Sequence, residues 1–514
     1  MLSNNNVSLE GCITKFKKIM KINTEISHDV FLSCVLDYTY FYNMTVCKNT
    51  PLLFEKLTNQ PPLKLKTYLV KYPISQKDLL DKAHELISDL ERNKLHQQQK
   101  DRFYKKFGIF LNSNEGPEKS KCNVCLDIDP LDFRRVYLDY NATTNIRPEV
   151  KKILQYYINN KIGFENPSSN TAEGKYQKDL IFKARQQISS DLSVKPENIT
   201  FTGSGSESNN LAIKGVAFKR LKEKGHIITS KIEHASVLET MKFLSNIGFE
   251  ITYLDVDKKG LVSPKLVKNN IKKNTFLVSI MAVNNEIGSI NPIHEIGAIC
   301  TSNKIIFMVD AIQAFGKIKI NPEKSGISLL SFSGHKIYGP KGIGGLYIRE
   351  GLELSPQIHG GGQEYGVRSG TENVMSILAL AKASELAHNE MGPENNRIKN
   401  LRDYFLKRII EIEPNIVVNG SINQRISNNL NIGFPHVDSG ALLKNLNKLG
   451  INVSLGSACS SGKIGESHVL LAIGADTKNY GSIRFSFGLN TTKVEIDYVI
   501  RQLYQIIPHL KEKK

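Results

Sequence analysis

A lysine that follows a strand-like run is the first residue whose type and place could do covalent chemistry. The run SLLSFS ends at Ser333, and the letters GHK that follow place Lys336 just beyond it. A lysine at a strand end can be partly desolvated, which lowers the pKa of its amine and lets it condense with an aldehyde. Taken alone, Lys336 could also be a solvated surface charge.

Asp310 and Gln313 form a second candidate pair. Asp310 closes the run IIFMVD, and Gln313 follows three residues later. An aspartate in this place can pair with a pyridinium nitrogen and keep it protonated, and a protonated ring is an electron sink. Gln313 could donate a hydrogen bond to a phenolate oxygen of the same ring. A helix-capping aspartate is the alternative interpretation.

A glycine- and serine-rich loop, FTGSGSESNNLAIKG at 201–215, predicts a phosphate site. A strand ends in the loop, which opens directly into a helix. Backbone N–H groups and hydroxyls from Gly203 to Ser206 could then bind a phosphate with help from the helix dipole. The loop matches neither common nucleotide-binding fingerprint, so it is a weak signal alone.

A cysteine among small residues is the fourth candidate. Cys459 lies in GSACSSG at 456–462. Such neighbours predict a loop that can move and expose the thiol, as a nucleophile that carries cargo requires. A buried cysteine in a turn is the alternative.

The elements that must position these residues begin at Val136. Short β-rich runs, such as HIITS, TFLVSIM and IIFMVD, alternate with helical segments such as 209–221 and 292–302. Continuous apolar strands joined by helices predict an α/β fold, with a mostly parallel sheet flanked by helices. Ligands in such sheets bind where the strands end.

A different pattern follows residue 373. Long helices are expected at 373–390 and 396–413, then short strands and helices up to a last helix at 494–510. The sequence therefore predicts a large domain at 136–393 and a smaller α+β C-terminal domain at 394–514, which carries the cysteine loop.

Residues 1–135 form an N-terminal extension whose fold and role the sequence does not assign. Residues 75–110 have helical spacing of apolar residues, and a turn-rich stretch follows. Within it, Cys122 and Cys125 could be half a zinc site, a thiol relay or a linker turn, because two ligands alone make no structural zinc site.

Composition narrows the class of protein. A chain of 514 residues predicts two or three domains, and its longest apolar runs are too short to span a membrane. The net charge of +18 invites nucleic-acid binding, yet the lysines are dispersed without a basic run, so that partner is not expected. Seven cysteines without a disulfide framework favour a reducing compartment. We expect a cytoplasmic enzyme, with organellar import left open.

The four pieces belong to a longer series of motifs that resembles a known family, the cysteine desulfurases of the NifS/IscS type. These are fold-type I, class V enzymes that use pyridoxal phosphate. The matching motifs are LDYNATT (138–144), ENPSS (165–169), SESNNLAIKG (206–215), EHASV (233–237), NNEIG (284–288), VDAIQ (309–313), SFSGHKIYGPKGIGGLY (331–347), HGGGQEYGVRSGTEN (359–373), GSACSS (456–461) and SIRFSFG (482–488).

The resemblance implies a role for each matched residue. Lys336 would carry the cofactor and move protons, His234 would stack on its ring, and Cys459 would take the sulfur as a persulfide. Asn285 and Arg484 would hold the substrate carboxylate, which suits the bidentate guanidinium. The cofactor-binding positions implied are Gly205, Ser206, His234, Asn285, Asp310, Gln313, Ser333, His335, Lys336 and Thr371. No metal is implied.

The implied activity converts L-cysteine to L-alanine and passes sulfur to an acceptor, either an iron–sulfur scaffold or a thiolation enzyme. Thr371 matches a threonine that reaches the phosphate of a neighbouring subunit, which implies a homodimer. Thr171 stands where the family has a histidine, and GSES replaces the usual ATES. A selenocysteine lyase, an inactive scaffold that binds an acidic carrier or RNA, and a class V aminotransferase remain as alternatives.

Overall fold

The computed structural model describes residues 136–159, 164–456 and 466–511, which lie in one compact unit, Arg135–Lys514. Its main sheet has seven strands in the order β2-β8-β7-β6-β5-β3-β4. These are β2 (Ile199–Thr202), β3 (His226–Ser230), β4 (Glu250–Leu254), β5 (Thr275–Met281), β6 (Ile306–Asp310), β7 (Leu329–Ser333) and β8 (Gly344–Ile348). β8 is antiparallel to both neighbours and the other pairs are parallel, so the expected mostly parallel sheet is confirmed.

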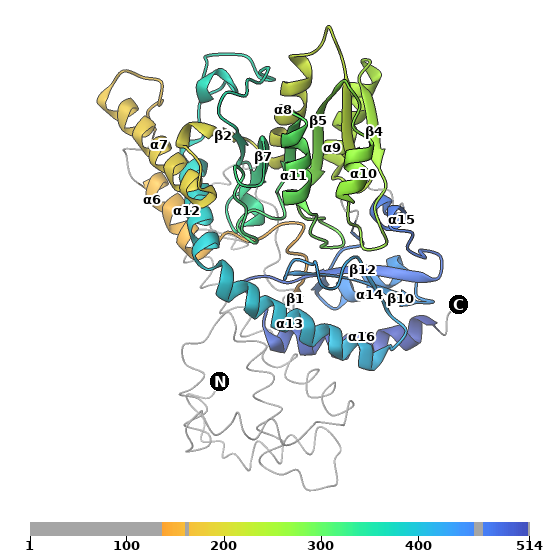
Figure 1. Ribbon diagram of the computed structural model, residues 1–514. Helices are drawn as coiled ribbons and strands as arrows, with labels where there is room; N and C mark the ends of the chain where they lie inside the picture. Colours follow the sequence, from red (N-terminus) through yellow and green to blue (C-terminus); the bar gives the residue numbers. More distant parts are fainter. Residues whose placement is uncertain (1–135, 160–163, 457–465, 512–514) are drawn as a thin grey trace, which may run out of the picture. The chain divides into compact units, whose positions relative to one another are not determined.

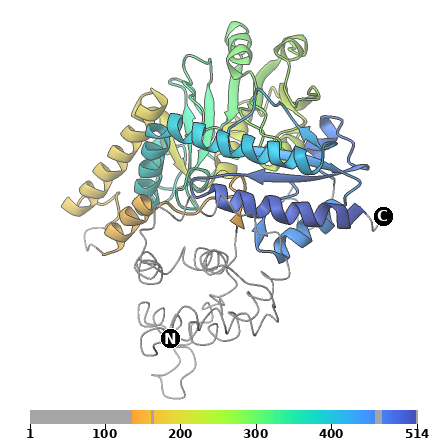
Figure 2. The same cartoon turned by 90° about the horizontal axis from the view of Figure 1, so that it is seen from below.

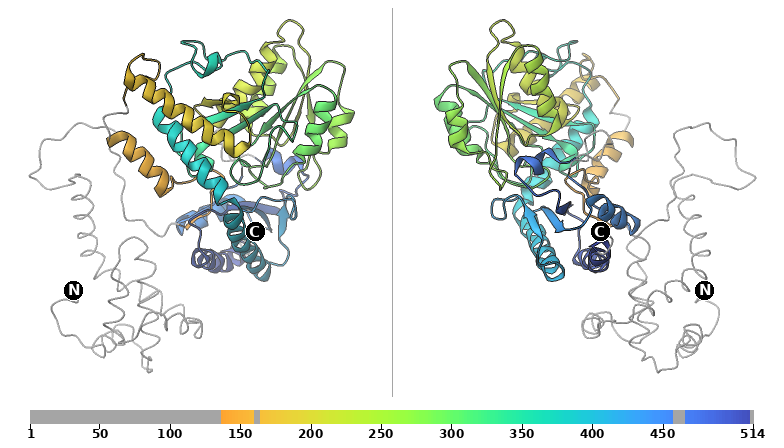
Figure 3. Two further views of the ribbon diagram at one scale, coloured as in Figure 1. Left: turned by 60° about the vertical axis from the view of Figure 1, so that its left-hand side comes forward. Right: turned by 90° about the vertical axis from the view of Figure 1, so that its right-hand side faces the viewer.

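Helices cover both faces of this sheet (Figure 1). They are α6 (Pro148–Asn159), α7 (Ala172–Leu192), α8 (Gly205–Phe218), α9 (Ala235–Asn246), α10 (Pro264–Asn269), α11 (Ile293–Ser302) and α12 (Val374–Asn389). Successive strand residues point to opposite faces. Leu277 and Leu329 therefore pack with α8 and α9, whereas Val278 and Leu330 pack with α7, α11 and α12. Figure 3 shows α7 and α12 side by side at one end of the sheet.

The C-terminal residues build a smaller antiparallel sheet in the order β12-β10-β9. Its strands are β9 (Val417–Asn419), β10 (Asn429–Pro435) and β12 (Tyr480–Ser486), and its helices are α13 (Met391–Ile412), α14 (Ser439–Lys448) and α16 (Lys493–Lys511). α13 and α16 run side by side (Figure 2). At the start of the described chain, β1 (Val136–Tyr137) pairs with β11 (Ile451–Asn452). Among the described residues, no helix is long and apolar enough to cross a membrane.

A buried ion pair fastens the segment after β8 to the main sheet. Arg185 of α7 meets Glu364 of the short helix η5 (Glu364–Gly366) at 2.8 Å, with side chains only 6% and 4% exposed. Glu364 also accepts from the backbone N–H of Phe201 at 2.8 Å, and Arg185 donates to the carbonyl of Ile199. Both β2 and α7 therefore hold η5 in place.

Candidate active site

β6 and β7 bring Asp310 and Lys336 to one edge of the main sheet. The two strands are parallel, with Asp310 opposite Ser331. Asp310 is the last residue of β6, and Lys336 ends the 3₁₀ turn η4 (Gly334–Lys336) that directly follows β7. The carboxyl ends of parallel strands lie at the same edge, where sheets of this type bind ligands. The two predicted residues therefore share a site.

An asparagine that the motif analysis did not single out fixes the Asp310 carboxylate. Asn209 Nδ2 donates to Asp310 Oδ2 at 2.8 Å, and the N–H of Ile312 donates to Oδ1 at 3.0 Å. Ser331 Oγ donates to Asn209 Oδ1 at 2.6 Å, which orients the amide so that Nδ2 faces Asp310. Asn209 lies within SESNN, one turn of α8 beyond Gly205, and this position was the available signal.

His234 lies beside the same network with a defined tautomer. It caps α9, and its Nδ1 accepts from the N–H of Ser236 at 3.1 Å. The Oγ of Ser236 in turn accepts from Asn209 Nδ2 at 2.9 Å. Burial lowers the pKa of His234, which favours the neutral ring. Because Nδ1 accepts a hydrogen bond, the neutral ring carries its hydrogen on Nε2. The predicted His234 and Asp310 are thus joined through Asn209 and Ser236.

The segment after β1 forms the floor beneath Lys336. Lys336 Nζ donates to the carbonyls of Asn141 and Ala142 at 2.7 and 2.6 Å. Gln313 Nε2 donates to the same Asn141 carbonyl at 2.8 Å. Asn141 is held by its own N–H, which donates to Ser486 Oγ at 2.9 Å. The motif LDYNATT had been noted, but its role as a floor emerges only in the structure.

Arg484 and Asn285, the predicted carboxylate-binding residues, lie together. Arg484 donates to the Asn285 carbonyl at 3.0 Å and forms an ion pair with Asp139 at 2.6 Å. Asn141 Nδ2 also donates to the Asn285 carbonyl, at 3.1 Å. The Nε of Arg484 is buried and has no partner among the described residues. A guanidinium with an unused donor can bind an incoming anion.

The start of α8 and the end of β7 form a cradle for a phosphate. Gly205 and Ser206 are the first residues of α8, so their N–H groups have no helical acceptor. A Cβ on Gly205 would lie 2.4 Å from Ile312 Cδ1, so a larger residue here would require the Ile312 side chain to move. Ser333 Oγ is buried and unpartnered within the described part of the chain. Ser206 has an exposed side chain.

Two neighbours of the cradle refine the prediction made from the loop sequence. The N–H of Gly203 donates to Glu207 Oε2 at 2.8 Å and is therefore already used. Ser204 caps α8 by accepting from the N–H of Glu207, which starts the helix at Gly205 rather than at 209. His335 contacts Thr143 Oγ1 at 3.0 Å, and burial, with help from Lys336, lowers the pKa of His335 to about 4.

These residues fit pyridoxal phosphate. An unpartnered Ser333 hydroxyl and free helix N–H groups suit its phosphate. The oriented carboxylate of Asp310 suits its ring nitrogen, and the amine of Lys336 suits its aldehyde.

The remaining predicted residues are Thr371 and three cysteines. Thr371 is exposed and shares no hydrogen bond with the other predicted residues that the structure describes. Cys459 lies outside the described residues, as do Cys122 and Cys125.

Thr171, which replaces the family's histidine, caps α7 by accepting from the N–H of Gly174 at 3.1 Å. Cys300 is buried in α11.

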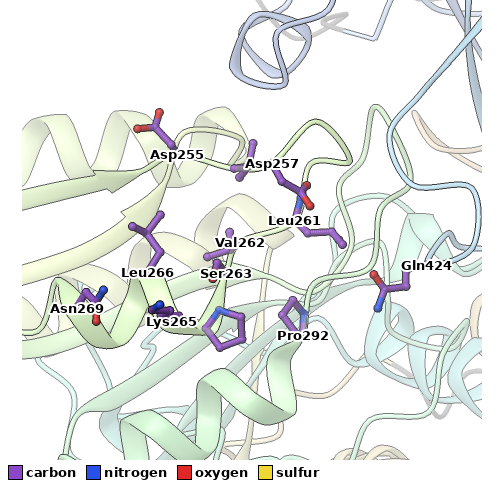
Figure 4. Close-up of a pocket in the computed structure, with 12 residues that line it drawn as sticks. Asp255, Asp257, Leu261, Val262, Ser263, Lys265, Leu266, Asn269, Pro292 and Gln424 are labelled. Atoms are coloured by element: carbon purple, nitrogen blue, oxygen red, sulfur yellow. The ribbon is translucent and has the colours of Figure 1, made fainter.

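A separate hollow of about 560 Å³ lies beyond the end of β4 (Figure 4). Asp255, Asp257 and Lys265 are among its lining residues, and Gln424 closes one side. None of the predicted site residues lines it, so it is not the site described above.

Comparison with known proteins is consistent with this geometry. Residues 136–499 match the model of the aminotransferase class-V family. A protein named cysteine desulfurase IscS from Dictyoglomus turgidum is 46% identical over 379 residues, which cover 74% of this chain and 96% of that protein. Its counterpart from Methanosarcina thermophila is 44% identical, covering 74% and 93%.

Two solved structures show the same architecture. One, described as a NifS-like protein, has a TM-score of 0.69 at 37% identity and covers 73% of this chain and 100% of its own. The other, described as SspA in complex with cysteine, has a TM-score of 0.62 at 40% identity, covering 68% and 98%.

Proposed function

The chain belongs to the aminotransferase class V family, its relatives there are cysteine desulfurases, and we propose that it removes sulfur from L-cysteine and leaves L-alanine. The sulfur is held on an enzyme cysteine and then passed to an acceptor. The observation that carries the proposal is the parallel pairing of β6 and β7, which puts the carboxylate of Asp310 and the amine of Lys336 at one edge of the sheet.

The residues that would hold pyridoxal phosphate are Lys336, Asp310, His234, Gln313 and the cradle at the start of α8. When bound, this group supplies an aldehyde for the substrate amine and a protonated ring that takes up electrons from Cα. Asp310 is held by Asn209 and by the backbone N–H of Ile312, so its carboxylate is already oriented before the cofactor binds. Ser333 supports the cradle through its unpartnered hydroxyl.

The chain's own side chains divide the remaining work. Arg484 and Asn285 bind the substrate carboxylate, since the buried Nε of Arg484 offers an unused donor. Lys336 Nζ takes the proton from the substrate Cα and returns one later. His234 offers its Nε2–H toward the same region, because its Nδ1 is occupied by Ser236. Cys459 accepts the sulfur, a role that rests on the resemblance of GSACSS.

We also infer a homodimer and an external sulfur acceptor. Thr371 lies on an exposed segment, where it is available to a second copy of the chain. The acceptor would be an iron–sulfur scaffold protein or a thiolation enzyme.

An absorption spectrum of the purified protein, with and without L-cysteine, tests the proposal. The loaded protein should be yellow, and added cysteine should change the band while alanine accumulates. Lys336→Ala should release no alanine. Parent-like alanine release by that variant would show that Lys336 is not the amine of this site, and a colourless parent that cannot be loaded would refute the cofactor assignment.

A further inference from the structure

A second amine lies within the same network as Lys336. Lys317 lies seven residues beyond Asp310, the last residue of β6. Its Nζ donates to Gln313 Oε1 at 3.1 Å. Its ammonium has no carboxylate within ion-pair distance among the described residues. Arg484, by contrast, pairs with Asp139. Among the described residues, the side chain that accepts from Lys317 is Gln313, the glutamine expected to face the cofactor ring.

This contact decides which way the Gln313 amide points. A protonated lysine amine only donates, so the atom that faces the Lys317 ammonium is the amide oxygen. A backbone carbonyl only accepts, so the atom that faces Asn141 must be the amide nitrogen, at 2.8 Å. If the amide were flipped, its nitrogen would face the Lys317 ammonium, donor to donor, and its oxygen would face the Asn141 carbonyl, acceptor to acceptor. The amide nitrogen is thereby fixed toward the carbonyl that Lys336 Nζ also contacts, at 2.7 Å.

The backbone around Lys317 is itself held. Its carbonyl accepts from Asn395 Nδ2 at 2.7 Å, and its N–H donates to the carbonyl of Ala314 at 2.9 Å. Gly316 adopts φ +69°, and a Cβ there would lie 2.8 Å from Ala387 Cβ. The lysine therefore reaches Gln313 from a turn that can take few other conformations.

Burying the ammonium of Lys317 costs free energy. Burial, with help from the charges of Lys336 and Arg484, lowers the pKa of Lys317 to about 7. Methionine would fill the same space without this cost. A buried amine at position 317 therefore indicates a functional role rather than a packing role.

We propose that Lys317 is a positioning residue, which holds the Gln313 amide so that its remaining N–H would be available to the cofactor when it is bound. The inference rests on the proposed function, because it concerns the same site. Lys317 touches neither substrate nor cofactor in this role, and acts through Gln313 alone.

The test compares Lys317→Met, Gln313→Met and the double variant, each loaded with pyridoxal phosphate. The readout is the pH midpoint of the cofactor's visible absorption change. Lys317→Met removes the donor to the Gln313 amide oxygen and lets the amide shift, so the midpoint should rise by about one pH unit. Gln313→Met should raise it too, and the double variant should equal Gln313→Met, because residues that act through each other are not additive.

Controls separate positioning from general disturbance. Lys319→Met removes an exposed lysine two positions further on and should leave the midpoint unchanged. Lys317→Arg keeps a donor and should restore the parent midpoint. If Lys317→Met does not fold, Lys317→Leu serves in its place with the same expected direction, because leucine also has no donor.

A loaded, active parent whose Lys317→Met and Lys317→Leu variants keep the parent midpoint would overturn the inference alone. Full additivity in the double variant would do the same. A parent that takes up no cofactor would overturn the proposed function itself.

Discussion

Removing the Glu364 carboxylate should destabilise the fold far more than removing an exposed ion pair. In Glu364→Ala, the guanidinium of Arg185 stays in a place where only 6% of its side chain is exposed. Among the described residues it keeps one hydrogen bond, to the Ile199 carbonyl, and its contacts with the rings of Phe201 and Tyr365. Stranding a buried charge in this way costs about 3–5 kcal/mol. The N–H of Phe201 also loses its acceptor, which places the loss toward the upper end of that range.

Urea unfolding followed by circular dichroism measures the free energy of unfolding. The matched control is Glu350→Ala, which removes the partner of Lys195 from a pair whose side chains are 72% and 61% exposed. That change should lie within experimental error. The slope against urea must match the parent's, so that the shift in midpoint reports stability. If Glu364→Ala unfolds at the same urea concentration as Glu350→Ala, then Arg185 reaches water and the pair does not hold η5.

Three further outcomes are expected. Asn209→Ala removes one donor from the carboxylate at the end of β6 and should weaken cofactor binding by about tenfold in a fluorescence titration, whereas Asn210→Ala should not. The pKa of His335 is lowered to about 4, so the unfolded chain binds its proton first as pH falls below about 6.5. The cofactor-free protein should therefore lose about 1–2 kcal/mol between pH 7 and 5, and His335→Gln should lose less in paired unfolding curves. Cys459→Ser should keep the cofactor's colour but gain no sulfur by mass spectrometry after brief cysteine exposure. Sulfur on the buried Cys300 of the parent would contradict that assignment.

The fold could be predicted because its signals are local. Apolar runs such as TFLVSIM became buried strands, and the helices expected at 292–302 and 373–390 are α11 (Ile293–Ser302) and α12 (Val374–Asn389). Asp310 and Lys336 were predicted to end or follow strands, and parallel pairing then brings them together without further information.

The supporting residues could not be predicted, since their contacts join distant parts of the chain. Asn209 reaches Asp310 across 101 residues, and Gln313 reaches Asn141 across 172. The SESNN motif marks the start of the helix, but no local spacing shows which of its asparagines reaches Asp310. The use of the Gly203 N–H by Glu207 was missed for a different reason, because a helix residue that turns back on its own loop competes with the ligand.

The floor of the site has a consequence for biosynthesis. The N–H of Asn141 is held by Ser486, 345 residues later in the sequence, and β1 pairs with β11. A ribosome therefore completes the cradle, the lysine and the strand-end aspartate well before the residues that fix the floor beneath them. Closing so long a loop is slow compared with forming the neighbouring helices. We therefore expect the main sheet to form first. The segment with β1 and Asn141 then docks with the segment with β11 and Ser486, and the cofactor binds last. A nascent chain halted before Ser486 should stay colourless in the presence of pyridoxal phosphate.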